Sequence, residues 1–200
     1  MKIIGLTGGI ASGKSTVARA LRNQGAVIIN ADKIGHEVIE PGKPAWKEIV
    51  SFFGSRVLNK DQQINRVELG KIVFDNLEYL KKLNSITHPR IIEAFKEALR
   101  TIRRRDPGAV IVMEIPLLFE VNMQEFCDEI WVVWVDRETQ INRLMKRDGL
   151  TRDHAIKRID AQMSLDEKAR RADIIIDNTK SIEETVNTTT RFFKEIFTNT

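Results

Sequence analysis

The chain has 200 residues, of which 42% are hydrophobic and 30% charged, and its formal net charge is +4. This composition is typical of a globular protein, and the single cysteine, Cys127, excludes an internal disulfide and a multi-cysteine zinc site. A chain of this length suits one domain, residues 1–200. No apolar run reaches the ~20 residues that a spanning helix needs, and Lys14 interrupts the first apolar stretch too early for a secretory signal. We therefore expect a cytoplasmic protein.

The first predicted elements are a buried strand over residues 2–6, a glycine-rich loop, and a helix from Lys14 to about Arg22. The loop matches G-x-x-x-x-G-K-[ST] with the residues Gly8, Gly9, Ile10, Ala11, Ser12, Gly13, Lys14, Ser15 and Thr16. Glycine permits the tight turn that points backbone N–H groups inward, and the helix N-terminus adds a positive dipole end. In such a loop the lysine reaches the β- and γ-phosphates and the serine hydroxyl holds Mg²⁺. Residues 8–16 are therefore predicted to bind a nucleoside triphosphate.

A second strand is predicted over residues 25–30, and Asp32 follows its end. In an open parallel sheet the ligand lies beyond the carboxyl ends of the strands, which favours a position for Asp32 beside the phosphates. Asp32 also fits an N-cap of a helix that begins near Lys33. Both interpretations stay open, and they are compatible.

Residues 41–105 have no strand-like pattern, which predicts a helical insertion between the second and third strands. The tetrapeptide 87–90 fits a helix start with Pro89 in the first turn, and a lone histidine such as His88 is more often structural than catalytic. The predicted helices cover residues 45–53, 66–74, 77–86 and 90–104.

The third predicted strand, residues 109–114, is apolar and ends in Glu114. An acidic residue at this point is typical of a Walker-B strand, in which it faces the magnesium ion. Glu114 is longer than the usual aspartate, so a water-mediated role fits equally well. The next segment, residues 116–120, has apolar side chains that we expect to be exposed, and the fourth strand is predicted over 129–136 with its tryptophans in the core.

Residues 137–163 read as two short helices joined by a glycine turn and rich in arginine, which indicates a lid that closes over phosphates. Arg143 and Arg147 share one helix face, Thr151 caps the second helix, and Gln162 is expected on that helix. A solvated charged face is the alternative. A fifth strand over 172–177 and a closing helix over 182–197 complete a doubly wound α/β domain with a parallel five-stranded sheet, and capping boxes occur at 164–167 and 181–184.

Several function classes compete for this arrangement. The GTPase motifs are misplaced, and 200 residues scarcely accommodate a nucleic-acid motor. The basic segment 137–171 contains no aromatic residues for base stacking, so we expect no nucleic-acid partner. A small-molecule kinase needs a phosphate cradle, a base near the acceptor and mobile arginines, and the sequence offers a candidate for each. No pattern in the sequence specifies an oligomeric state.

Five features of the sequence resemble the dephospho-coenzyme A kinases. They are the opening run 5–16, Ala31-Asp32, His88-Pro89, the 116–120 segment and the Arg143…Arg147…Gln162 pattern. The resemblance extends in order over nearly the whole chain. It implies a P-loop kinase fold and transfer of the ATP γ-phosphoryl group to the 3′-hydroxyl of dephospho-coenzyme A. The loop motif predicts Mg²⁺, and the absence of a long apolar run predicts no membrane partner. A nucleoside or nucleotide kinase and a nucleotide-sensing switch are the alternatives.

Residue roles follow from this resemblance as hypotheses. Asp32 would deprotonate the acceptor hydroxyl, Lys14 would act at the β- and γ-phosphates, and the two lid arginines would clamp the phosphoryl oxygens. Ser15 and Glu114 would hold the metal. The substrate would contact Asp32, His88, Pro89 and Leu117, with residues 41–105 as the acceptor subdomain. Asn30, Glu114 and the segment 177–180 depart from the family pattern.

Overall fold

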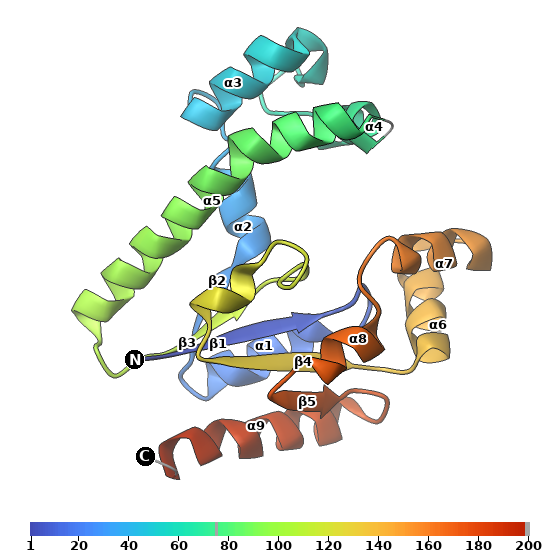
Figure 1. The fold of residues 1–200 in the computed structure, drawn as a ribbon. Helices are drawn as coiled ribbons and strands as arrows, with labels where there is room; N and C mark the ends of the chain where they lie inside the picture. The colour runs from blue at the N-terminus through green and yellow to red at the C-terminus, as the bar shows by residue number, and fades with distance from the viewer. Residues whose placement is uncertain (75, 199–200) are drawn as a thin grey trace. The chain divides into compact units, whose positions relative to one another are not determined.

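The computed structural model describes residues 1–74 and 76–198, which form two compact units (Figure 1). The first unit comprises Met1–Asn30 and Asp106–Thr200, and the second comprises Ala31–Arg105. The second unit is therefore inserted in sequence between the second and third strands of the first.

The first unit is built on a parallel sheet with the strand order β2-β3-β1-β4-β5. Because parallel strands are covered on both faces, they read as continuous apolar runs, and the first four residues of β3 are all buried. This confirms the predicted doubly wound fold with five parallel strands. The strands are β1 (Lys2–Gly8), β2 (Val27–Asn30), β3 (Val110–Glu114), β4 (Glu129–Trp134) and β5 (Ile174–Asp177).

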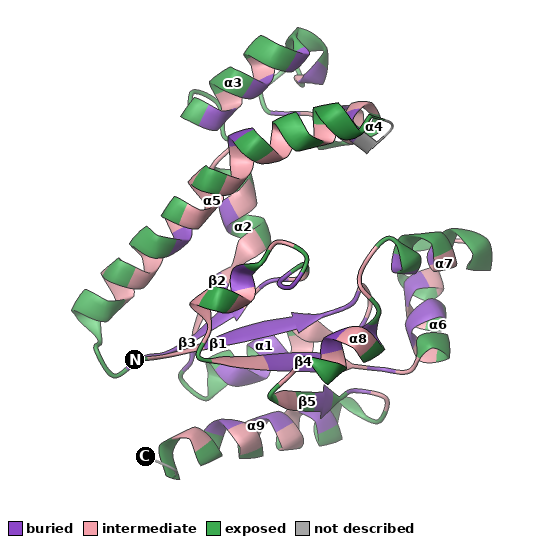
Figure 2. Ribbon diagram, in the orientation of Figure 1, coloured by how far each residue is buried: buried purple, intermediate pink, exposed green. Residues whose placement is uncertain are grey.

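Helices and loops cover both faces of this sheet. Val17 and Leu21 of α1 and Phe193 of α9 pack with Ile4 and Leu6 of β1 in one buried cluster, whose positions are purple in Figure 2. The helices of this unit are α1 (Lys14–Asn23), η2 (Met123–Phe126), α6 (Arg137–Asp148), α7 (Arg152–Asp160), α8 (Leu165–Arg170) and α9 (Ile182–Thr198).

The segment after β3 covers part of the other face. A side chain at Gly5 would meet Cys127 Sγ and Leu118 Cδ1, each at 2.7 Å, so only glycine leaves room for this packing. Leu118 and Phe119 are buried, which corrects the prediction that the apolar side chains of this segment are exposed, whereas Leu117 is exposed. Apolar residues of the segment thus serve mainly as core.

The second unit consists of helices around a core of its own. Ile49 and Phe53 pack with Val57, Leu69 and Ile86 in this core. Within the described part of the chain, no helix combines the length and apolar character needed to cross a bilayer. The elements are α2 (Ala31–Glu37), α3 (Pro44–Phe53), η1 (Ser55–Val57), α4 (Arg66–Phe74) and α5 (Leu77–Arg105).

Helix α5 is continuous, which corrects the prediction of two helices with a start at residues 87–90. Pro89 lies inside it, although an interior proline costs about 3 kcal/mol because it removes one backbone donor. Ile86 and Phe95, on either side of the proline, are both buried. Burial of an apolar face along the whole helix therefore outweighs the local preference to stop at the proline.

The predicted caps at Thr151 and Ser181 are confirmed. Thr151 accepts a hydrogen bond from the His154 amide at the start of α7, and Ser181 and Glu184 form a reciprocal capping box. At Ser164 only half of the box forms, because Glu167 pairs instead with Arg170, at the end of the same helix, and with the C-cap residue Arg171. The predicted elements otherwise agree with the structure to within a few residues at their ends.

Candidate active site

The glycine-rich loop connects β1 to α1 in a conformation that depends on left-handed backbone angles. Ala11 has φ 60° and Gly13 has φ 90°, and α1 begins at Lys14. Gly13 is required by space as well as by angle, because an added Cβ would lie 2.0 Å from Nδ2 of Asn178. The loop is therefore shaped by a residue far along the chain.

Three amide side chains hold the backbone of this loop. Nε2 of Gln140 donates to the Ile10 carbonyl at 2.8 Å, and Oε1 of Gln162 accepts from the Ile10 amide at 3.0 Å. Nδ2 of Asn178 donates to the Ser12 carbonyl at 2.8 Å. Gln140 and Asn178 are buried, so their bonds are shielded from competing water. Together they fix the loop from α6, from the α7–α8 connection and from the end of β5.

Sequence reasoning missed Gln140 and the support that Asn178 gives to the loop. A signal for Gln140 existed, because it lies one turn before Leu144 on the buried face of α6. A buried amide on an apolar face needs hydrogen-bond partners, and such a residue is a candidate for holding a backbone. Gln162 follows the end of α7, which corrects its predicted place on that helix.

The structure brings Arg143 to this support and gives Arg147 a different partner. Arg143 donates to the Asn178 carbonyl at 2.9 Å, directly beside the amide that holds the loop. Arg147 forms a two-bond ion pair with Asp148, at 2.7 and 3.1 Å, and Arg158 joins the same carboxylate. The hydrogen bonds from Arg147, followed by the charges of both arginines, lower the pKa of Asp148.

The remaining predicted residues are divided between the two units. Asp32 is exposed in the first turn of α2, which begins at Ala31, so the structure corrects the prediction of an N-cap before a helix at Lys33. In the second unit as well, His88 is half-buried in α5, and burial lowers its pKa. Pro89 follows it and is exposed.

Comparisons with known proteins identify the family of this chain. The family model described as dephospho-CoA kinase matches residues 2–184. The chain belongs to the dephospho-CoA kinase family. It is 51% identical over 187 residues to the dephospho-CoA kinase of Carboxydothermus hydrogenoformans, covering 92% of this chain and 89% of that protein.

Solved structures support the same assignment to the dephospho-CoA kinase family. The dephospho-CoA kinase of Campylobacter jejuni is 33% identical, with a TM-score of 0.75 and 98% of both chains covered. A protein of Thermus thermophilus is 31% identical, with a TM-score of 0.83 and 97% of both chains covered. The chain is thus a P-loop kinase, and ATP is the phosphoryl donor that this family implies.

Two residues that depart from the expected dephospho-CoA kinase pattern contact each other. Asn30 and Glu114 are register partners at the ends of β2 and β3, and Nδ2 of Asn30 donates to Oε2 of Glu114 at 2.8 Å. An amide beside the carboxylate avoids the like-charge repulsion of two adjacent acids. The pair therefore keeps one negative charge at this end of the sheet.

No group of three or more His, Cys, Asp or Glu side chains suited to a metal occurs among residues 1–74 and 76–198. Mg²⁺ does not require one, because in kinases it uses one or two protein oxygens together with substrate phosphates and water. The hydroxyl of Ser15, in the first turn of α1, and the carboxylate of Glu114 are oxygen donors of this kind. The residues present therefore fit a magnesium ion held mainly by a nucleotide.

Proposed function

We propose that the chain transfers the γ-phosphoryl group of ATP to the 3′-hydroxyl of the ribose of dephospho-coenzyme A, giving coenzyme A and ADP. Membership of the dephospho-CoA kinase family supports this reaction. The observation that supports it best is the loop 8–16, whose left-handed turn, helix start and buried amide supports are suited to binding phosphate. The buried hydroxyl of Ser12 has no hydrogen-bond partner within the described residues, which leaves a donor in the loop for a ligand.

Lys14 and the lid arginines act on the phosphates in this proposal. Lys14 begins α1 and would neutralise charge between the β- and γ-phosphates, as the equivalent lysine does in P-loop enzymes. Arg143 and Arg147, in the proposed lid 137–163, would bind the oxygens of the transferring group. To do so, Arg147 would have to break its ion pair with Asp148, whereas Arg143 would give up only its hydrogen bond to the Asn178 carbonyl.

Asp32 is the proposed general base. It follows β2 by two residues, and in open parallel sheets the residues just beyond strand ends face the ligand crevice. A carboxylate can accept the proton of the attacking hydroxyl, whereas an amide cannot. The side chain is exposed, so it is accessible to a substrate.

Ser15 and Glu114 would hold Mg²⁺, which supplies charge neutralisation at the β- and γ-phosphates when bound. The helical residues 41–105 would bind the acceptor, and His88, Pro89 and the exposed Leu117 are its predicted contacts. These assignments, the cytoplasmic location and the lack of a nucleic-acid or membrane partner stay predictions of the sequence.

An acceptor panel tests the proposed reaction. Purified protein is incubated with Mg²⁺ and ATP labelled at the γ-phosphate, and with dephospho-coenzyme A, nucleosides or nucleoside monophosphates in separate reactions. The expected result is labelled coenzyme A from the unaltered protein and none from the Lys14→Met variant, which serves as the inactive control. Label in a nucleotide alone would indicate a nucleotide kinase, and ATP binding without any product would indicate a nucleotide-sensing switch.

A further inference from the structure

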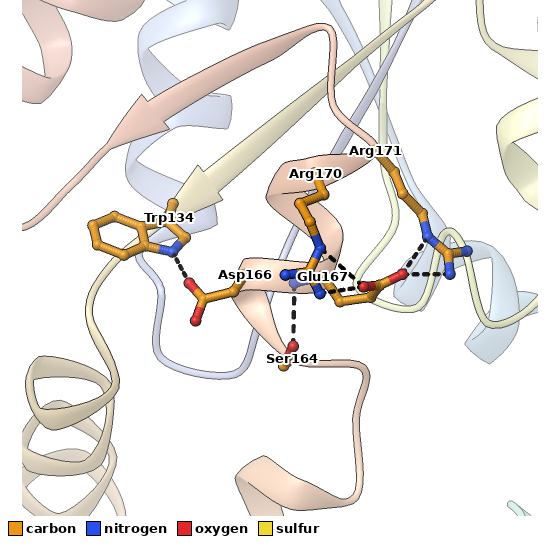
Figure 3. Close-up of polar contacts among 6 residues, drawn as sticks. All are labelled: Trp134, Ser164, Asp166, Glu167, Arg170 and Arg171. Carbon is orange, nitrogen blue, oxygen red and sulfur yellow. Dashed lines mark hydrogen bonds and ion pairs between the residues drawn. The ribbon is translucent and has the colours of Figure 1, made fainter.

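Helix α8 is held firmly in the first unit, although it has only six residues (Figure 3). Its N-cap Ser164 accepts from the Glu167 amide at 3.1 Å, and Trp134 of β4 donates its indole N–H to Asp166 at 2.8 Å. At the other end, Arg171 pairs with Glu167 and lies over the ring of Phe119, 5.7 Å from its centre. The helix is thus bound to the sheet and to the segment after β3.

Lys168 projects from this helix into the protein and is completely buried. Its ammonium group donates to the Pro116 carbonyl at 2.7 Å and contacts the two oxygens of Glu120 at 2.9 and 3.1 Å. The Pro116 carbonyl also accepts from Oγ1 of Thr7, at 3.1 Å. Thr7 immediately precedes the glycine-rich loop 8–16, which we call the phosphate loop. One lysine therefore joins α8, the segment after β3 and the end of β1.

Glu120 extends this network to the loop itself. Its Oε1 also accepts from the Met163 amide at 3.1 Å, which fixes the connection between α7 and α8. The preceding residue is Gln162, whose side chain accepts from the Ile10 amide of the phosphate loop. The ion pair of the buried Lys168 with Glu120 is therefore one residue away from a direct support of the loop.

Stability alone is a weak reason for this pair. Burial lowers the pKa of Lys168, although the hydrogen bond and charge of Glu120 act in the opposite direction. The ammonium group is fully buried, whereas the Glu120 side chain is 23% exposed. Even a wholly buried ion pair can often be replaced by well-packed hydrophobic residues of similar volume without loss of stability. A geometric task explains the choice better, because three acceptors converge on a single ammonium group.

We propose that Lys168 and Glu120 are positioning residues of this kinase, which act by holding Gln162 against the Ile10 amide and so fix the nucleotide-binding shape of the phosphate loop. The inference rests on the proposed function for its kinetic consequence, but its structural part concerns nucleotide binding alone. Neither residue needs to touch the substrate for this role.

A double variant separates positioning from stability. Lys168→Met alone leaves the Glu120 side chain, which is 23% exposed, without its ion-pair partner and is expected to lower the melting temperature. Lys168→Met combined with Glu120→Gln removes both charges and is expected to keep a melting temperature near that of the unaltered protein. If the pair positions the loop, this double variant raises the dissociation constant of ATP and the KM for ATP by fivefold or more. Its kcat should fall less than its KM rises.

Gln162→Ala should produce a similar rise in the KM for ATP, and adding it to the double variant should produce little further change. The exposed pair of Lys81 and Glu78 supplies the matched control, as Lys81→Met with Glu78→Gln, and should leave ATP binding unchanged. A folded double variant with unaltered ATP affinity and KM would overturn the proposal. A triple variant in which Gln162→Ala raises the KM for ATP by the same factor as it does alone would also overturn it. If the unaltered protein binds ATP but forms no coenzyme A, the proposed function is refuted and this inference is not.

Discussion

The side-chain amide of Asn178, just after β5, donates a hydrogen bond of 2.8 Å to the carbonyl of Ser12 in the phosphate loop, and the two residues lie 166 positions apart. Oδ1 of Asn178 in turn accepts from the buried Thr185 hydroxyl of α9 at 2.7 Å, and the backbone carbonyl of Asn178 accepts from Arg143. The asparagine thus connects the closing helix and the proposed lid to the proposed nucleotide-binding loop.

Gly13→Ala should weaken ATP binding by tenfold or more, about 1.4 kcal/mol. The added Cβ would lie 2.0 Å from Nδ2 of Asn178 and would occupy a left-handed conformation, so the loop has to change shape. Gly25→Ala is the matched control, because Gly25 also has a positive φ, of 99°, but an added Cβ there meets nothing within 4 Å. Titration calorimetry measures both affinities, and equal losses in the two variants would contradict a local effect.

Asp32→Asn should lower kcat by about 10²-fold or more while ATP binding stays normal, because the amide cannot take the proton of the acceptor hydroxyl. Glu37→Gln, on the same helix, removes an exposed carboxylate that pairs only loosely with Lys33, at 3.7 Å, and should change little. Turnover of Asp32→Asn near that of the unaltered enzyme would remove Asp32 as the base.

Arg143→Ala should depress kcat by tenfold or more, about 1.4 kcal/mol of barrier, because a charged donor to the transferring group is lost. Arg137→Ala provides the comparison, since Arg137 lies on the same helix and pairs with Asp160 at the surface. Steady-state rates at saturating ATP distinguish the two variants. An unchanged rate for Arg143→Ala would leave this residue as a support of Asn178 only.

Gly5→Ala should lower the free energy of unfolding by about 1–3 kcal/mol, the usual cost of overpacking a core. The new methyl group would lie 2.7 Å from both Cys127 Sγ and Leu118 Cδ1. Gly108→Ala, whose Cβ would meet only Asp106 at 3.5 Å, should be nearly neutral. Urea unfolding followed by circular dichroism gives the comparison. Adding Cys127→Ala to Gly5→Ala should recover part of the loss, and no recovery would assign the strain to Leu118.

His88→Gln should reduce the loss of stability that acid causes. Burial lowers the pKa of His88 in the folded protein, so the unfolded chain takes up this proton first as the pH falls below about 6.5. The contribution of His88 to stability is therefore present above that pH and is lost as the pH falls towards the folded pKa. Melting temperatures at pH 7.5 and 5 should differ less in His88→Gln than in the unaltered protein, with the exposed His154→Gln as control. Identical differences in all three proteins would contradict this assignment.

The sequence by itself determined the phosphate loop, the five strands and the family, because these depend on local patterns. The left-handed turn at Gly13 favours glycine, buried parallel strands require continuous apolar runs, and helix ends require caps such as Thr151. Each signal lies within a few neighbouring residues, so it is readable without coordinates.

Tertiary structure alone decided how α5 passes Pro89 and what holds the loop in place. The proline signal was correct as a local preference but was outweighed by burial on both sides of it. Gln140 and Lys168 look like ordinary polar residues of charged helices until the fold surrounds them with carbonyl and carboxylate oxygens from distant segments. Their partners lie 130 and 52 positions away in sequence, and only the folded chain brings such groups within hydrogen-bonding distance.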